Sequence, residues 1–118
     1  MAAGFQRENV TMIKLPRIIN DYIKASNAHD VKSILSCFSD DASVRDEGKE
    51  LRGKENIGGW IAETIEKYKF QLKPLSIKED NVDVVVPVEV SGTFDGSPVT
   101  LDYHFTIESG KIRSLTID

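Results

Sequence analysis

The stretch "CFSDDASVRDEGKELRG", residues 37–53, decides the fold of this chain. Residues 42–46 within it alternate between apolar and polar side chains, and successive side chains of a strand point to opposite faces of a sheet. The pattern predicts a strand in which Asp46 shares a face with Ala42 and Val44. A carboxylate at the end of an apolar face is either held inside a pocket or begins a turn toward water.

Two helices are predicted before this strand and a third after it. The first helix is predicted to begin at Pro16, which suits a first helical turn, because apolar residues follow it at three- and four-residue spacing. It is expected to end at Asn27 in a left-handed conformation. Asp30 can cap a second short helix, which the acidic pair at 40–41 ends. The sequence "DEGKELRG" then predicts a turn-rich loop, and the third helix begins near Lys54.

The second half of the chain predicts antiparallel strands. Alternation with a period of two runs through four segments that turn sequences separate: 69–78, 81–94, 99–108 and 111–117. Pro74 and Pro87 interrupt two of them, which indicates sheet edges or bulges. The predicted fold class is α+β, with three N-terminal helices packed on a curved, mainly antiparallel sheet. We expect one domain over residues 14–118, after a flexible lead-in over residues 1–13.

The two faces of the predicted sheet differ in composition. One face of the segment 99–108 is apolar and should pack toward the helices, with Leu101, Tyr103 and Phe105 at its centre. On the opposite, outer face of the sheet, the segment 81–94 contributes two apolar residues, Val85 and Pro87. No helix remains to cover them, so a second copy of the chain is the simplest cover, and we expect a homodimer through the outer sheet face.

The composition excludes several classes of function. The 118 residues carry a net charge of −4 without a basic block, which argues against nucleic-acid binding. No apolar run approaches the ~18 residues that suggest a membrane span. The single cysteine, Cys37, excludes an internal disulfide framework, and we expect a cytoplasmic location. The two histidines show no metal-ligand spacing, so no metal is expected.

Residues 22–57, "YIKASNAHDVKSILSCFSDDASVRDEGKELRGKENI", resemble the nuclear transport factor 2-like superfamily. The likeness lies in a first helix that ends in N-x-x-D, followed by a short helix that leads into F-x-D-D-A-x-V-x-D. This superfamily includes the ketosteroid isomerases and the SnoaL-like polyketide cyclases. The resemblance implies a cone-shaped, cystatin-like α+β fold and a small-molecule-binding SnoaL-like domain.

The resemblance to ketosteroid isomerases extends to single residues. Tyr22 falls where that family has its oxyanion-donating tyrosine, and Asp46 falls where it has its general base. The family's third group is a protonated aspartate just before "HF", where this chain has Tyr103, and Glu47 stands where a proline is common. The likeness implies that the three catalytic residues share a pocket lined by Trp60, Phe38, Val44, Phe105 and Leu101.

The implied chemistry is proton abstraction next to a carbonyl of a small, mostly apolar compound, without a cofactor. An isomerase, a cyclase or a dehydratase would work in this way. The residues also have plainer interpretations, because Asp46 fits a turn and Tyr22, Tyr103 and Trp60 fit an apolar core. In that case the chain is a non-catalytic ligand-binding or dimerisation module of the same fold.

Overall fold

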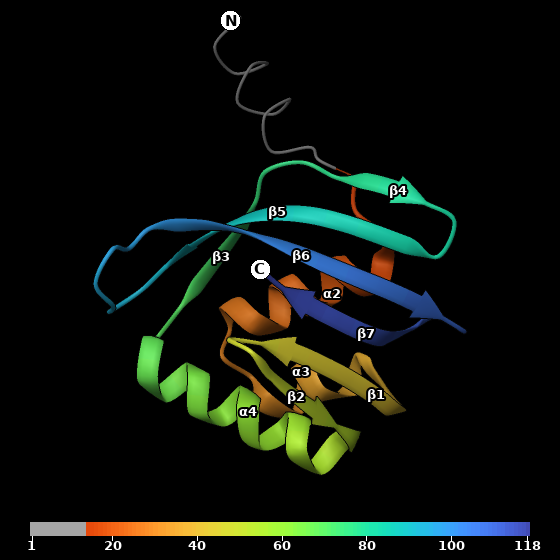
Figure 1. Ribbon diagram of the computed structural model, residues 1–118, viewed down its shortest axis with the longest axis horizontal. Coiled ribbons are helices and arrows are strands. Elements are labelled where there is room, and N and C mark those ends of the chain that lie inside the picture. Colours follow the sequence, from red (N-terminus) through yellow and green to blue (C-terminus); the bar gives the residue numbers. More distant parts are fainter. Residues whose placement is uncertain (1–13) are drawn as a thin grey trace, which may run out of the picture.

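The computed structural model describes residues 14–118, and the lead-in expected over residues 1–13 lies outside this part (Figure 1). The described part contains three helices and seven strands. In chain order they are α2 (Arg17–Asn27), α3 (Val31–Ser36), β1 (Phe38–Asp46), β2 (Lys49–Arg52), α4 (Gly53–Tyr68), β3 (Gln71–Pro74), β4 (Lys78–Asp80), β5 (Asp83–Ser91), β6 (Val99–Glu108) and β7 (Lys111–Ile117). The α+β class is confirmed.

The seven strands form one sheet in the order β2-β1-β7-β6-β5-β3, and β4 also pairs with β5. The expected antiparallel meander is confirmed for β5, β6 and β7. Strand β1 pairs with β7 in parallel, which the sequence did not indicate, so the sheet is mixed. Helix α2 packs against β3 and β7, and α4 packs against β1 and β2 (Figure 1).

The loop expected from "DEGKELRG" is instead a hairpin. Strand β2 pairs antiparallel with the end of β1, and the turn between them is Glu47-Gly48. Both turn residues have positive φ angles, 54° and 78°. Such a two-residue turn matches the right-handed twist of paired strands. Glutamate rarely adopts this conformation, which is why the hairpin was missed.

Strand β1 begins earlier than the predicted 42–46, at Phe38. Its pairing with β7 shifts register between Phe38 and Ser43. Asp40 and Asp41 lie in this irregular part of the strand, so they do not end α3 as expected. Local irregularity bends a strand, and here it lets β1 leave α3 directly and still join the sheet.

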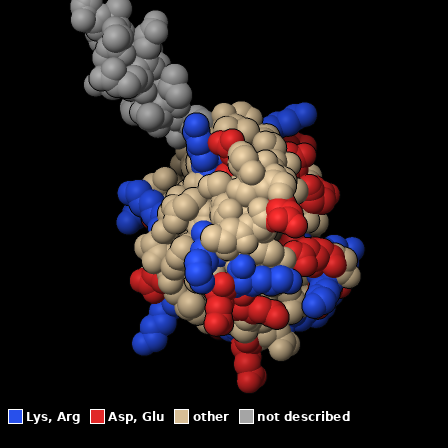
Figure 2. Space-filling model, turned by 90° about the vertical axis from the view of Figure 1, so that its left-hand side faces the viewer, with Lys and Arg blue, Asp and Glu red and all other residues tan. Residues whose placement is uncertain are grey.

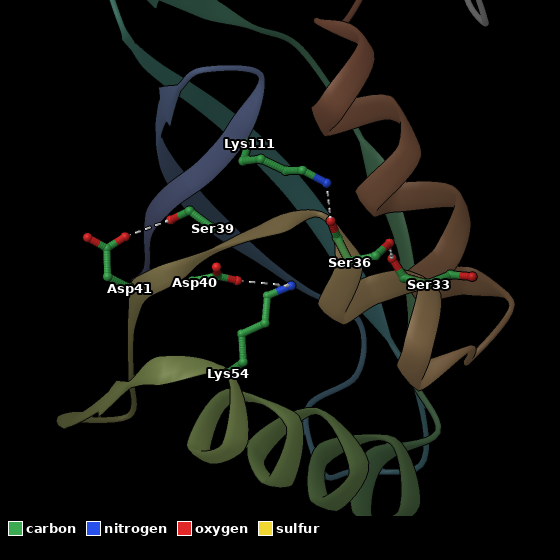
Figure 3. A network of polar contacts seen from close by, with 7 residues as sticks. All are labelled: Ser33, Ser36, Ser39, Asp40, Asp41, Lys54 and Lys111. Carbon is green, nitrogen blue, oxygen red and sulfur yellow. Dashed lines mark hydrogen bonds and ion pairs between the residues drawn. The ribbon is translucent and has the colours of Figure 1, made fainter.

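Polar contacts join the α3–β1 connection to its neighbours (Figure 3). Lys111 Nζ donates to the carbonyl oxygen of Ser36 at 2.7 Å, which joins β7 to the end of α3. Lys54 Nζ lies 3.9 Å from an Asp40 oxygen, which joins the start of α4 to β1. The side chains are mostly exposed, so we expect each of these contacts to contribute little to the free energy of unfolding.

The segment 69–78 forms two short strands, β3 and β4, where one strand was expected. Both pair with β5, and the break between them lies opposite Pro87. The Pro87 carbonyl faces this break and accepts from Leu75 N at 2.9 Å. A proline has no N–H to offer on that side, so the outer partner is interrupted there. Pro74 ends the edge strand β3, as expected for a strand proline.

The junction of α2 with β3 differs from the sequence expectation. The left-handed residue after α2 is His29, with φ 55°, and Asn27 is the last residue of the helix. The Asn27 side chain pairs with the backbone of Leu72, accepting from its N–H at 2.7 Å and donating to its carbonyl at 2.9 Å. His29 Nε2 donates to the Phe70 carbonyl at 2.6 Å. These bonds hold β3 against α2.

The apolar core lies between the helices and the inner face of the sheet. In β6, Tyr103 and Phe105 are buried while Thr100 and Asp102 are exposed, which confirms the predicted faces of this strand. On the outer face Val85 is half-buried. Within residues 14–118, none of the helices is both long and apolar enough to span a bilayer.

The glycine after β5 is required by close backbone approach. A Cβ at Gly92 would overlap the carbonyl oxygen of Tyr68, which accepts from Thr93 N at 2.8 Å. We expect Gly92→Ala to lower the free energy of unfolding by about 1–3 kcal/mol, as overpacking does. Gly59 is the matched control, because a Cβ there meets open space and Gly59→Ala in a helix should stabilise by about 1 kcal/mol. Urea denaturation of both variants checks the opposite signs, and a neutral Gly92→Ala would contradict the prediction.

Candidate functional site

A cavity of about 310 Å³ lies between the inner face of the sheet and helices α2 and α4. Its wall is mostly apolar, and it includes six aromatic side chains. These are Tyr22, Trp60, Tyr68, Phe70, Phe94 and Tyr103. A cavity of this size with a few polar groups is typical of a small-molecule site.

The three residues predicted to be catalytic all line this cavity. Asp46 is the last residue of β1, Tyr22 lies in the middle of α2, and Tyr103 lies in β6. Both tyrosines are buried, whereas Asp46 is half-buried. Three elements far apart in the sequence therefore bring a carboxyl group and two phenol groups to one space.

The residues expected to line the pocket fall into two groups. Trp60 and Leu101 lie on the cavity wall. The other three are fully buried in the core behind it: Phe38, Val44 and Phe105. The rings of Phe38 and Phe105 meet the Tyr22 ring edge-on, with centroids 5.9 and 5.6 Å away. They thus hold Tyr22 in place without reaching the cavity.

Trp60 contacts Asp46 in a way that the sequence did not indicate. Its indole Nε1 donates to Asp46 Oδ2 at 3.0 Å. An indole N–H only donates, so the bond fixes the orientation of the carboxylate and favours its charged form. A partly buried tryptophan needs a hydrogen-bond partner for its N–H. The sequence therefore indicates that Trp60 has an acceptor. Nothing in the sequence tells which of the many carboxylates supplies it.

Burial sets the protonation of the three groups. Burial raises the pKa of Asp46, while the bond from Trp60 opposes this shift. The neighbouring charge of Glu47 adds a smaller upward effect on the Asp46 pKa. Burial also raises the pKa of Tyr22 and of Tyr103, and the Asp46 charge raises both further. The tyrosines therefore keep their O–H protons at neutral pH, beside a carboxyl group that takes up a proton more readily than usual.

A second bond lies beside the first and marks the rim of the cavity. Tyr68 Oη donates to Glu47 Oε2 at 3.0 Å, so α4 is joined to the β1–β2 turn at two neighbouring points. The Tyr68 ring meets the Phe94 ring edge-on at 5.7 Å. Figure 2 faces this end of the molecule, where uncharged residues occupy the middle of the surface and charged side chains of both signs surround it. The rim is thus built from α4, the β1–β2 turn and the β5–β6 connection.

A sequence profile of the SnoaL-like domain matches residues 19–115 of the chain. The chain belongs to the SnoaL-like family. The match spans every element from α2 to most of β7, including all three residues on the cavity predicted to be catalytic. The resemblance to the nuclear transport factor 2-like superfamily is thereby confirmed for nearly the whole described chain.

Solved structures with this fold include proteins of several organisms. A proposed polyketide cyclase from Sinorhizobium meliloti is 38% identical to this SnoaL-like domain, with a TM-score of 0.86 over 88% of this chain and 95% of that one. A protein with a ketosteroid isomerase-like fold from Catenulispora acidiphila, in complex with trimethylamine, is 18% identical, with a TM-score of 0.79 over 89% and 86%. A Mycobacterium tuberculosis protein in complex with estradiol-17beta-hemisuccinate is 16% identical, with a TM-score of 0.73 over 85% and 88%. No curated protein sequence matches the chain.

One group of side chains in the described part of this SnoaL-like domain could supply three ligands to a metal ion. Asp102, His104 and Asp118 offer ligand atoms within 4.8 Å of one another, and His104 Nε2 lies 3.0 Å from Asp118 Oδ1. They lie on the outer face of the sheet, away from the cavity. Exposed groups of this kind are common without an ion, and the expectation of no metal remains a prediction.

Proposed function

We propose that this SnoaL-like domain binds a small, mostly apolar carbonyl compound and acts as a cofactor-free isomerase, cyclase or dehydratase. The observation that carries the proposal is a half-buried carboxyl group, Asp46, on the same cavity as two buried tyrosines. An acid whose pKa is raised toward neutrality is an effective general base near neutral pH, because its pKa then lies close to the working pH.

Each group has a distinct role in this proposal. Asp46 takes a proton from the carbon next to the carbonyl, and the C–H electron pair moves into an enolate. The hydroxyl groups of Tyr22 and Tyr103 donate hydrogen bonds to the enolate oxygen, where negative charge develops. Asp46 then returns the proton to the same or another carbon, or a leaving group departs from the enolate. Every step uses side chains of this chain alone.

The relatives support the small-molecule part of the proposal. The Sinorhizobium meliloti protein, a proposed polyketide cyclase, shares 38% of its aligned residues with this chain. The two more distant structures hold trimethylamine and a steroid hemisuccinate, and they share the fold alone with this domain. Small organic molecules thus bind proteins of this fold, which favours a ligand-binding role for the cavity.

The proposal is tested by the pKa of Asp46, followed by NMR of its carboxyl carbon during a pH titration. We expect a value above the ordinary ~3.9 of an aspartate. Trp60→Phe removes the donor that favours the charged form, so it should raise this pKa further. Tyr68→Phe is the matched control, because Tyr68 donates to Glu47 rather than to Asp46. A wild-type value at or below ~3.9 would identify Asp46 as a turn residue and end the catalytic proposal.

We also propose that the domain forms a homodimer through the outer sheet face. Val85 and Pro87 are half-buried there, and no helix covers them in the described chain. Sedimentation equilibrium should give twice the mass of the chain, and Val85→Glu should yield a single-chain mass. Val82→Glu is the control, since Val82 is 54% exposed in the β4–β5 turn. A wild-type protein with the mass of one chain would contradict the proposal.

The cytoplasmic location and the lack of nucleic-acid binding stay predictions.

A further inference from the structure

Ser26 is a polar residue deep inside the described part of this SnoaL-like domain. It lies in α2, it is only 1% exposed, and it contributes to the cavity wall. The other buried residues of α2 are apolar or aromatic, namely Ile19, Tyr22 and Ile23. A buried hydroxyl group is unfavourable unless it forms a hydrogen bond, so the position of Ser26 requires a partner.

The partner of Ser26 is a side chain rather than the backbone. Serine residues in helices commonly bond to the backbone of the preceding turn, and Ser36 Oγ in α3 donates in this way to the Ser33 carbonyl at 2.8 Å. The Ser26 hydroxyl instead forms a hydrogen bond with the hydroxyl of Tyr22. The two residues are one helical turn apart, so they lie on the same face of α2.

The bond from Ser26 controls what ring packing leaves free. The rings of Phe38 and Phe105 meet the Tyr22 ring edge-on and hold it in place, but a phenol proton still rotates about its C–O bond. A phenol oxygen that accepts from Ser26 keeps its own proton for another acceptor. The direction of the Tyr22 O–H bond is therefore set by Ser26.

The neighbouring carboxyl group does not take the Tyr22 proton. Within the described chain, the hydrogen bonds to Asp46 come from the Trp60 indole and from the backbone N–H of Glu47. Asp46 acts on Tyr22 through its charge alone. The proton of Tyr22 is thus available to a ligand oxygen in the cavity that Tyr22 and Asp46 both line.

The two phenol groups on the cavity differ in their support. Burial raises the pKa of Tyr22, and the bond from Ser26 opposes this shift. Burial, Tyr22 and Asp46 all raise the pKa of Tyr103, and no hydrogen bond from the described chain opposes them. Hydrogen bonds in a chain polarise one another, so an O–H group that accepts a bond donates a stronger one. Tyr22 is therefore the better donor of the two.

From these contacts, and on the basis of the proposed function, we infer that Ser26 is a positioning residue for the reaction. Ser26 Oγ donates to Tyr22 Oη, and Tyr22 Oη donates to the carbonyl oxygen of the ligand. This relay holds the phenol proton toward the oxygen and strengthens its bond as negative charge develops on the enolate. Tyr103 is a second donor without such support.

A purely structural role for Ser26 makes a different prediction. Helix α2 packs against β3 and β7, and a small side chain lets a helix approach a sheet closely. Alanine is nearly the same size as serine and favours helices. If Ser26 is needed only for its size, Ser26→Ala leaves both the bound ligand and the reaction unchanged. The relay requires its hydroxyl group.

The first test follows the carbonyl group of a bound ketone. The probe is 7,7-dimethyloctan-2-one, a small apolar ketone, labelled with carbon-13 at its carbonyl. A stronger hydrogen bond lowers the carbonyl stretching frequency, which difference infrared spectroscopy measures. We expect Ser26→Ala to shift the band toward its position in hexane, and Tyr22→Phe to shift it further. Ser36→Ala is the matched control, because Ser36 is exposed in α3, and its band should equal that of the wild type.

The second test measures deuterium uptake by the same ketone in D₂O. At saturating ketone, Ser26→Ala should slow uptake by about two- to tenfold, the effect of one ordinary hydrogen bond, while ketone affinity changes little. Tyr22→Phe should slow it by about 10²- to 10³-fold, as loss of a direct donor does. The double variant should be no slower than Tyr22→Phe alone, because Ser26 acts through Tyr22.

Three outcomes would overturn the inference, and they separate it from the proposed function. If Ser26→Ala matches the wild type in band and rate, the inference is wrong while the proposed function stands. If Ser26→Ala slows uptake by the same factor with and without the Tyr22 hydroxyl, Ser26 acts on the ligand directly and the relay is wrong. If the wild type neither binds the ketone nor exchanges its protons, the carbonyl-binding function falls and the inference falls with it.

Discussion

Asp46→Asn is expected to slow proton exchange at the α-carbon of a bound ketone by about 10²- to 10⁴-fold, the range that a positioned general base contributes. An asparagine keeps the size of the side chain and can still accept from Trp60 Nε1, but it cannot take up a proton. The measurement is uptake of deuterium by 7,7-dimethyloctan-2-one in D₂O, followed by NMR. It needs no knowledge of the natural substrate, because it reports proton abstraction alone.

The control for this experiment is Asp80→Asn, the same change on an exposed strand outside the cavity. Its exchange rate should equal that of the wild type. Exchange that persists unchanged in Asp46→Asn would show that Asp46 is not the base. The domain would then be a ligand binder or an oligomerisation module of the same fold.

Asp46→Asn should also be more stable than the wild type at neutral pH. The pKa of Asp46 is raised in the folded protein, so the folded state binds this proton more tightly than the unfolded chain does. The wild type therefore loses stability as the pH rises from the ordinary aspartate pKa of ~3.9 through the raised value. Asparagine has no such loss. Unfolding free energies of both proteins between pH 4 and 7 should diverge in favour of the variant, and parallel curves would contradict the shift.

Phe105→Ala is expected to cost about 3–5 kcal/mol of unfolding free energy, as removal of a buried aromatic ring does. Phe105 is 1% exposed, and its ring lies between those of Tyr22 and Tyr103, with centroids 5.6 and 6.2 Å away. The lost volume would leave a void behind both tyrosines. Chemical denaturation measures the loss, and ketone binding by the folded fraction should weaken as well, because the tyrosines lose their support.

Leu75→Ala is the matched surface control for Phe105→Ala. Leu75 is 42% exposed, so its truncation should change stability by no more than about 0.5 kcal/mol. A loss at Phe105 no larger than that at Leu75 would mean that the core does not depend on this ring. Full stability with lost ketone binding would instead place Phe105 on the binding surface itself.

Local sequence patterns predicted most of the elements because those patterns have local causes. The period of two in β5, β6 and β7 follows from one face against the core, and the cap at α3 follows from Asp30, which accepts from Ser33 N at 3.2 Å. The β1–β2 hairpin was not predicted because glutamate rarely adopts a positive φ angle, so Glu47 gives no sequence signal of a left-handed turn. The division of segment 69–78 was missed because its cause, Pro87, lies on another strand.

The sequence by itself determined the α+β class, the inner face of β6 and, through the resemblance, Asp46, Tyr22 and Tyr103 as candidates. Only the tertiary structure decided that these residues line one cavity and that Trp60 donates to Asp46. The physical reason is the range of the forces involved. Periodicity and capping act within a few residues, whereas an open cavity and its charge depend on how side chains from α2, α4, β1, β5 and β6 fill one volume together.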